Sequence, residues 1–232
     1  MTNEMLGRMT PQRRQIIEHV ARNEMSTNAV VQSLFFAGRH PSTTTRCTAD
    51  LVAQQWLNSY TLLHPQSYLR LGRRGARAFG RSSHATEPLG PQALPKQMAV
   101  LRYVTSASGT VVRLLPTELQ ARYDWMPPVF QATPHCLRRS TDGDVLELIR
   151  VDFGGTADYQ VRACRKFVAA RLQIPGYRQL LRERSLQMVM VTTTKERAKR
   201  IQASLDRSSW PAELSFRLAV FTDLLSLFPK PR

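Results

Sequence analysis

The sequence has few cysteines, few acidic residues and no long apolar run. Its three cysteines, Cys47, Cys136 and Cys164, are far apart, and none has C-x-x-C spacing. This pattern predicts neither a zinc site nor a disulfide framework, and it indicates a reducing compartment. No apolar run reaches the ~18 residues that a membrane span needs, and residues 1–10 lack the apolar segment of a signal peptide. We therefore expect a cytoplasmic protein without a membrane partner.

The signatures of common catalytic sites are missing as well. The five histidines show neither H-x-x-x-H nor H-x-H spacing, and the sequence contains no G-x-S-x-G and no Walker-type Gly-Lys-Ser/Thr. The stretch "FGGT" (153–156) lacks the third glycine and the strand–turn–helix context of a dinucleotide-binding loop. We therefore predict no catalytic residue, no metal ligand and no cofactor, and a protein that is not an enzyme.

Positive charge is what the chain has in excess. It contains 33 Lys and Arg residues against 17 Asp and Glu residues, a formal net charge of +16. The excess is present both in residues 1–90 and in the remainder of the chain. A field of this sign attracts polyanions, and nucleic acid is the commonest of these in a cell. A basic but otherwise ordinary soluble protein is the alternative interpretation.

Three short helices are expected in the first 55 residues. Thr10-Pro11 is a helix-start signal, because the hydroxyl caps the helix and proline suits its first position. Ser26 and Ser42 are the expected caps of the next two helices. The helices are predicted over residues 11–24, 26–35 and 42–55. Helical spacing predicts that their buried faces carry Ile16, Ile17, Val20, Val30, Val31, Leu34, Phe35, Cys47, Leu51 and Val52.

A β-hairpin is expected after the third helix. Residues 56–63 and 67–71 have the composition of two short strands around a turn at 64–66, and 73–80 resembles one more helical turn. Three helices followed by a hairpin is the order of a winged helix-turn-helix. Residues 1–80 are therefore predicted to be a DNA-binding domain of this kind.

A linker and a second domain are predicted to follow. Residues 81–95 are polar and rich in proline and glycine, as linkers are. Residues 96–232 alternate between strand and helix patterns, which predicts an α/β domain with parallel neighbouring strands. The expected strands are 144–153, 186–194 and 213–224, and the expected helices are 95–107, 157–172 and 195–207. Residues 109–116 fit a strand or a short turn, and 122–140, with three prolines, are expected to be irregular.

The third helix is the candidate for reading DNA. A recognition helix needs short polar or basic side chains near its N-terminus, and hydroxyls and arginine can bond phosphates or base edges. The candidate residues here are Ser42, Thr43, Thr44, Thr45, Arg46 and Thr48. In the hairpin, the candidate phosphate contacts are Tyr68, Arg70, Arg73 and Arg74. A capped, solvated helix start and a solvated charged face are the alternatives to these interpretations.

The order of these parts resembles the replication-relaxation family. The resemblance is carried by "MTPQRRQIIEHVARNEMST", "LVAQQWLNSYTLL", "YLRLGRRGARAFG", "LELIRVDFGGT" and "LQMVMVTTTKERAKRI". It implies a protein of a plasmid or an integrative element, with a winged helix followed by a restriction-endonuclease-like domain. Two features depart from the family: "LGRRGARAF" replaces the usual threonine-proline-glycine turn, and Arg150 occupies a position where relatives carry a carboxylate.

The predicted strand 144–153 raises the question of a nuclease. Such a site needs at least two carboxylates on Mg²⁺, usually with a nearby lysine. Asp144 and Asp152 are about 27 Å apart on an ideal strand, and Gly154 stands where a lysine is expected. Glu147 and Asp152 point to opposite faces, and Arg150 would repel the metal. We expect Asp152 instead to cap the following helix, and the metal-dependent nuclease or nickase is the alternative.

The expected function is therefore sequence-specific binding of double-stranded DNA, in transcriptional regulation or as an accessory in replication or conjugative transfer. The second domain is expected to form a homodimer, to grip more DNA, or to bind a relaxase or replication partner. Its predicted helices carry two basic groups. These are Arg162, Arg165, Lys166 and Arg171 in one helix and Lys195, Arg197, Lys199 and Arg200 in the other, and a solvated helix face is the alternative for both.

Overall fold

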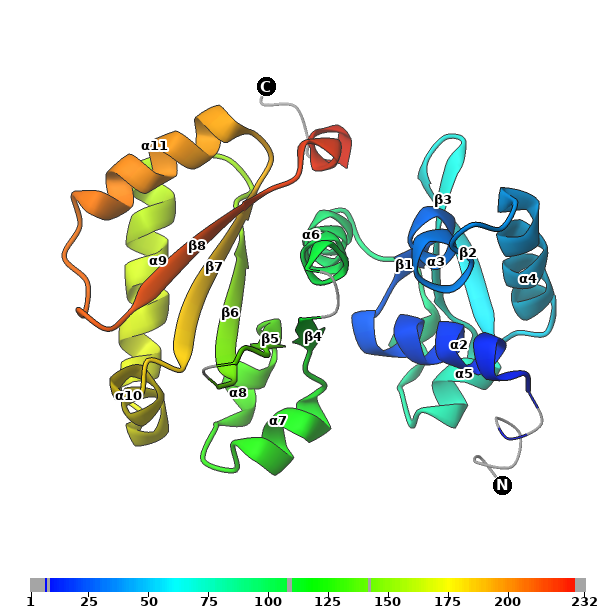
Figure 1. Ribbon diagram of the computed structural model, residues 1–232, viewed down its shortest axis with the longest axis horizontal. Helices are drawn as coiled ribbons and strands as arrows, with labels where there is room; N and C mark the ends of the chain where they lie inside the picture. Colours follow the sequence, from blue (N-terminus) through cyan, green and yellow to red (C-terminus); the bar gives the residue numbers. More distant parts are fainter. Residues whose placement is uncertain (1–6, 8, 108–109, 142, 228–232) are drawn as a thin grey trace. The chain divides into compact units, whose positions relative to one another are not determined.

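The computed structural model describes residues 7, 9–107, 110–141 and 143–227. The chain is mixed α/β and forms two compact units, Met1–Leu101 and Arg102–Arg232, each built around a sheet of its own (Figure 1). Within the described ranges, no helix has both the length and the apolar character needed to cross a bilayer.

Unit 1 combines helices with a three-stranded antiparallel sheet. Its elements are α2 (Pro11–Asn23), β1 (Ser26–Thr27), α3 (Asn28–Phe35), α4 (Pro41–Ala53), β2 (Leu57–Leu63), β3 (Gln66–Leu71), α5 (Arg73–Ala78) and the 3₁₀ helix η1 (Ser83–Thr86). The strand order is β1-β3-β2. Ser26 pairs with Leu69, and Leu57 pairs with Leu71 at the open end of the β2–β3 hairpin. The three predicted helices and the predicted hairpin are thus present.

The core of unit 1 forms where the predicted helical faces meet the sheet. Ile16, Ile17 and Val20 of α2 are fully buried, as expected, and Trp56 is 3% exposed. One apolar prediction is wrong: Leu34 is 46% exposed, because α3 is only eight residues long and its buried side carries Val30 and Val31.

Two predicted helix caps are also wrong. Ser26 pairs in β1, so the neighbouring Thr27 caps α3 by accepting a hydrogen bond from the Val30 N–H. At α4 the cap is His40, whose ring nitrogen accepts the N–H of Ser42. Ser42 itself lies in the first turn of α4 rather than before it.

One side chain, Gln32, fixes the turn between α3 and α4. Its amide nitrogen donates to the carbonyls of Phe36 and Arg39, 2.7 Å from each. Its amide oxygen accepts the hydroxyl of Thr44 in α4. The turn also contains Gly38 with φ +75°, a conformation that glycine adopts without strain. Gln32 thus joins the end of α3, the turn and the first turns of α4.

The segment predicted as a linker, 81–95, is part of unit 1. The Thr86 carbonyl accepts hydrogen bonds from Asn58 and Tyr60 of β2. The N–H of Leu89 donates to the Tyr68 hydroxyl at 2.8 Å. The segment therefore lies along the hairpin, and its last residues already begin helix α6 (Ala93–Ser106).

Unit 2 is built on a five-stranded mixed sheet in the order β4-β5-β6-β7-β8. After α6 its elements are β4 (Val111–Arg113), α7 (Pro116–Arg122), α8 (Pro128–Gln131), β5 (His135–Arg138), β6 (Val145–Val151), α9 (Ala157–Leu172), α10 (Pro175–Arg182), β7 (Leu186–Thr192), α11 (Lys195–Asp206), β8 (Ser215–Val220) and the 3₁₀ helix η2 (Thr222–Leu227). β4, β5 and β6 pair antiparallel, whereas β6, β7 and β8 pair parallel, as predicted for the strands that alternate with helices.

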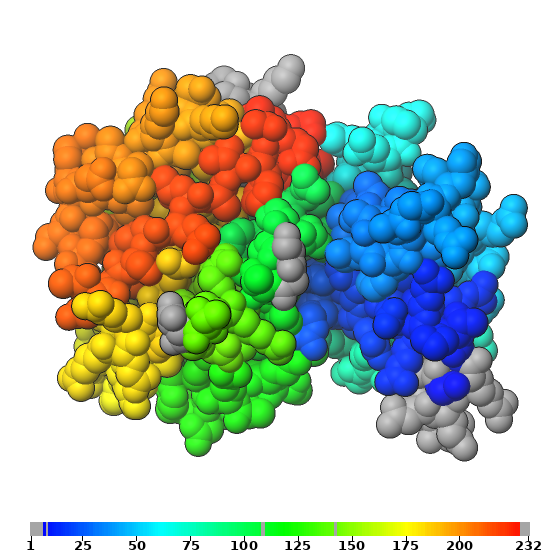
Figure 2. All heavy atoms as spheres, in the orientation of Figure 1, coloured from blue at the N-terminus to red at the C-terminus, as the bar shows by residue number. Residues whose placement is uncertain are grey.

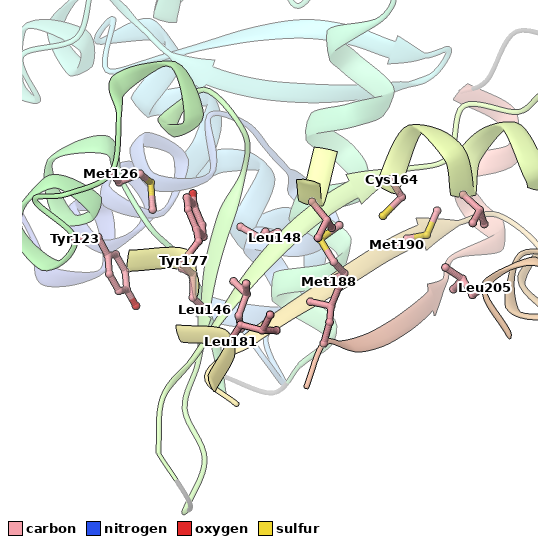
Figure 3. Packing of buried hydrophobic residues seen from close by; sticks show 14 of the residues in the cluster. Tyr123, Met126, Leu146, Leu148, Cys164, Tyr177, Leu181, Met188, Met190 and Leu205 are labelled. Carbon is pink, nitrogen blue, oxygen red and sulfur yellow. The ribbon is translucent and has the colours of Figure 1, made fainter. Parts of the chain in front are cut away.

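Helices α9, α10 and α11 cover one face of this sheet. Leu148 from β6 and Met188 from β7 point toward Cys164, Tyr177 and Leu205 of the three helices (Figure 3). The sequence missed α7 and α10, and it missed α8 and β5 inside the stretch 122–140 that was expected to be irregular. β5 is only four residues long, too short for a clear alternation of apolar and polar residues.

We expect Gln32→Leu to destabilise unit 1 by about 1–3 kcal/mol. The change leaves the carbonyls of Phe36 and Arg39 and the hydroxyl of Thr44 without their partner. Gln15→Leu, on an exposed position of α2, is the matched control and should change stability by about 0.5 kcal/mol or less. Chemical denaturation followed by circular dichroism measures both. Equal effects of the two substitutions would contradict the role assigned to Gln32.

Candidate nucleic-acid interface

Helix α4 has one buried and one exposed face. Leu51 is fully buried against the core of unit 1. The exposed face carries Ser42, Thr43, Thr45, Arg46, Ala49 and Ala53. α4 lies at the surface of unit 1 in Figure 2, in the lighter of the two blues. Its N-terminal half therefore presents three hydroxyls and one guanidinium to solvent and no carboxylate.

Two of the predicted α4 contacts, Thr44 and Thr48, are on the buried face. They are 1% and 3% exposed. The Thr48 hydroxyl donates to the Thr44 carbonyl at 3.0 Å, and the Thr44 hydroxyl donates to Gln32. Thr44 joins α4 to α3, whereas Thr48 bonds only within α4. Both are buried, and the prediction that they contact DNA is corrected on this ground.

Two of the predicted hairpin contacts, Tyr68 and Arg70, are also internal. Tyr68 is 2% exposed and its hydroxyl accepts from Leu89. Arg70 is 7% exposed, and its guanidinium donates to the carbonyls of Glu24 and Glu87. Burial lowers the pKa of Arg70. Both side chains fasten β3 to its neighbours, so neither is available to a phosphate.

The other two predicted hairpin contacts, Arg73 and Arg74, are exposed but lie at the base of the hairpin. The N–H of Arg74 donates to the Gln55 carbonyl at 2.9 Å, next to the C-terminal end of α4. Since α4 rises about 1.5 Å per residue, this place is about 18 Å from Ser42. The structure thus separates the predicted arginine cluster from the N-terminal half of α4.

Two groups of exposed residues in unit 1 were not predicted from the sequence: Arg39 before α4, and three residues at the tip of the hairpin. Arg39, in the turn before α4, is exposed. At the far end of the hairpin, Leu63, His64 and Gln66 are exposed as well, with Leu63 at 37%. The register Leu63↔Gln66 marks this end as the tip. The sequence could have indicated Arg39, because a basic residue directly before a predicted recognition helix is placed to contact a phosphate of DNA.

The acidic residues near α2 and α4 are already used inside unit 1. Arg13 pairs with Asp50 and Arg14 pairs with Glu18, both at 2.7 Å. Arg39, Arg46 and Arg73 form no salt bridge with any residue that the structure describes. The positive charges of Arg39 and Arg46 at the start of α4, and of Arg73 at the base of the hairpin, are therefore not neutralised by a neighbouring carboxylate within the described ranges.

In unit 2, each carboxylate along β6 is engaged by a different arginine. Before the strand, Asp144 meets Arg122 at 2.7 Å. Within the strand, Glu147 is fully buried and meets Arg138 at 2.6 Å. After the strand, Asp152 meets Arg197 at 2.6 Å. The three carboxylates do not converge on one point.

The surroundings of Asp152 differ in detail from the expectation. Its two carboxylate oxygens accept both Nε and Nη2 of Arg197, and Thr192 and Gly154 donate as well. This network ties the end of β6 to β7 and α11. The cap of α9 is Thr156, whose hydroxyl accepts the Tyr159 N–H. The prediction that Asp152 caps α9 is therefore wrong.

Burial holds three side chains near the sheet of unit 2, His135, Cys136 and Cys164, in their neutral forms. Burial lowers the pKa of His135 to about 4, so the ring is neutral at pH 7. Burial raises the pKa of Cys136 to about 12 and that of Cys164 to about 11. Across the described ranges, no three His, Cys, Asp or Glu side chains gather in a way that could hold a metal ion.

Comparison of the chain with protein-family models, with curated proteins and with solved structures finds no match. The resemblance to the replication-relaxation family thus stays a prediction that rests on the sequence.

We expect Asp152→Asn to lower the stability of unit 2 by about 3–5 kcal/mol. The substitution leaves the Arg197 guanidinium, whose side chain is 17% exposed, without its counter-ion. Asp144→Asn breaks a more exposed pair and should cost about 1 kcal/mol or less. Thermal and urea unfolding of the two variants provide the measurement, and a similar loss in both would contradict the structural role of Asp152.

Proposed function

We propose that the chain is a sequence-specific double-stranded DNA-binding protein whose unit 1 is a winged helix-turn-helix module. In this proposal α4 enters the major groove and the β2–β3 hairpin is the wing. The single observation that carries it is the division of α4. Its outer face presents Ser42, Thr43, Thr45 and Arg46, while its inner face packs Leu51 into the core and bonds Thr44 to Gln32 of α3.

The topology of unit 1 supports this proposal. A helix, a short strand, two helices and a hairpin follow one another, and the short strand pairs with the second strand of the hairpin. A recognition helix held by a tight turn behind a second helix is the arrangement of helix-turn-helix proteins. The turn fixed by Gln32 supplies that geometry.

Each exposed residue can be given a role from its chemistry. Arg46 is suited to the O6 and N7 atoms of guanine. The hydroxyls of Ser42, Thr43 and Thr45 suit phosphates or base edges, and the methyl groups of the threonines suit thymine. Arg39, by its place before α4, is suited to a phosphate. Arg73 and Arg74 would contact the backbone about 18 Å away, which is half a turn of B-DNA or more along the duplex.

We further propose that unit 2 is a non-catalytic domain of the restriction-endonuclease-like kind and that the protein serves a plasmid or an integrative element. The strand order of its mixed sheet and the helices between its parallel strands support the first part. The arginine partners of Asp144, Glu147 and Asp152 support the absence of a metal site. The family resemblance suggests transcriptional regulation or an accessory role in replication or transfer. A homodimer would place two recognition helices on half-sites one helical turn apart, and a relaxase is the other proposed partner.

We expect Arg46→Ala to weaken binding to a specific site by about 1–3 kcal/mol while random duplex DNA is bound nearly as before. The site itself can be recovered from fragments of genomic DNA retained by the purified protein. Arg73→Ala is the matched comparison. It should weaken both duplexes alike and reduce the slope of log affinity against log salt by about 1. Equal losses on specific and random DNA with Arg46→Ala would contradict a base-reading role.

A metal-dependent nuclease or nickase is the second candidate, because β6 lies in the middle of a mixed sheet and has carboxylates within it and on both sides. Such a site would require Asp152 to leave Arg197. We therefore expect supercoiled plasmid incubated with the protein and Mg²⁺ or Mn²⁺ to stay intact. Nicking that disappears with Asp152→Ala and persists with Asp144→Asn would overturn the non-catalytic interpretation.

A further inference from the structure

Helix α9 presents a basic stripe to solvent on the side opposite the core. Val161, Cys164 and Val168 face the core. Tyr159, Arg162 and Lys166 follow one another at spacings of three and four residues, so they share one face of the helix. All three are exposed, and the same face continues with Ala169, Ala170 and Gln173.

The cations of this stripe have little internal compensation. Arg162 and Lys166 form no salt bridge in the described part of the chain. The one carboxylate at the start of α9, Asp158, accepts the Ser204 hydroxyl at 2.5 Å and Arg207 at 3.2 Å. The Ser204 hydrogen bond is the first cause of the lowered pKa of Asp158, and the charges of Arg207 and Arg162 contribute to it. The acid is thus directed toward α11 and leaves the stripe positively charged.

An exposed aromatic ring stands at the end of the stripe, next to the turn before α9. Tyr159 is 59% exposed, although large aromatic side chains usually bury most of their surface. A Cβ atom added to Gly155 would lie 3.7 Å from Cδ1 of Tyr159, so the ring lies against the turn before α9. Gly154 and Gly155 both have positive φ in this turn. Phe153, two residues earlier than Gly155, is 49% exposed.

We propose that this surface, defined as Tyr159, Arg162 and Lys166, binds single-stranded nucleic acid. Proteins that bind unpaired strands combine cations that follow the phosphates with aromatic rings on which bases stack. A ring offers its face to an unpaired base, whereas in a duplex the bases are already stacked on one another. The inference goes beyond the duplex binding proposed for unit 1, and it uses none of the residues of α4.

The test uses the full chain and a fluorescent oligothymidine of about 20 nucleotides, long enough for the site sizes of such surfaces. Tyr159→Ala should weaken binding about tenfold, and Tyr159→Trp, which keeps a stacking ring, should restore it. Arg162→Gln with Lys166→Gln should lower the slope of log affinity against log salt by about 1.4, the value for two phosphate contacts on a single strand. Photocrosslinking of 5-iodouracil to residue 159, mapped by mass spectrometry, reports direct contact.

A matched control removes the same charge elsewhere in unit 2. Arg182→Gln with Lys199→Gln changes two exposed cations, one on α10 and one on α11, and should leave oligothymidine binding nearly unchanged. Four results would overturn the proposal: no binding of the oligonucleotide at low salt, equal losses with both double variants, no effect of Tyr159→Ala, or competition by polyglutamate as effective as by unlabelled oligothymidine. The last result would assign the stripe to an acidic protein.

Specific duplex binding, measured on the same variants, separates this proposal from the function proposed for unit 1. Arg46→Ala should reduce specific duplex binding and leave oligothymidine binding intact. Tyr159→Ala should reduce oligothymidine binding and leave specific duplex binding intact. If the α9 variants reduce duplex and single-strand binding by the same factor, the preference for single strands is wrong, whatever the result for Arg46.

Discussion

The amide of Gln32 is the contact on which the DNA-binding proposal for unit 1 depends. It accepts from Thr44 and donates to two carbonyls of the turn, so three backbone or side-chain groups from α3, the turn and α4 share one partner. All of these groups are uncharged. This set of hydrogen bonds is therefore insensitive to salt, unlike the ion pair of Arg13 and Asp50 that also holds α4. Thr48 lies on the same inner face, and among the described residues the outer face bonds only to residues at the start of α4 itself.

A second constraint is the scarcity of acids. In both units several carboxylates connect two elements through an arginine: Asp50 joins α4 to α2, and Asp152 joins β6 to α11. Glu147 joins β6 to β5, and its neighbour Tyr103 on α6 lies 2.9 Å from both carboxylate oxygens. Once the acids have been placed in this way, the cations left on α4, on the hairpin base and on α9 keep their full charge. The same pairing that stabilises the fold thus produces the surface that attracts a polyanion.

The sequence correctly predicted long helices and strands in which apolar residues recur regularly. It did not predict elements of only a few residues. α9 was predicted with its observed bounds because apolar residues recur through sixteen positions. β5 and α8 are four residues each and adjoin prolines, so no periodicity was available for them. At the candidate interface, charge and residue type identified Arg46 correctly as exposed. They did not reveal that Arg70 is buried, because a carbonyl that accepts from a guanidinium comes from a distant segment, here Glu24 and Glu87.

The division of the threonines on α4 has an evolutionary consequence. Thr44 and Thr48 are buried, while Ser42, Thr43, Thr45 and Arg46 are exposed and, in the part of the chain that the structure describes, the hydroxyls of Ser42 and Thr45 bond only to His40 and Pro41 beside them. If α4 reads DNA as proposed, substitutions at its outer positions would change the sequence it recognises at little cost in folding. Related proteins could then acquire new DNA sites by single substitutions on the outer face of α4, while the buried residues of unit 1 stay the same.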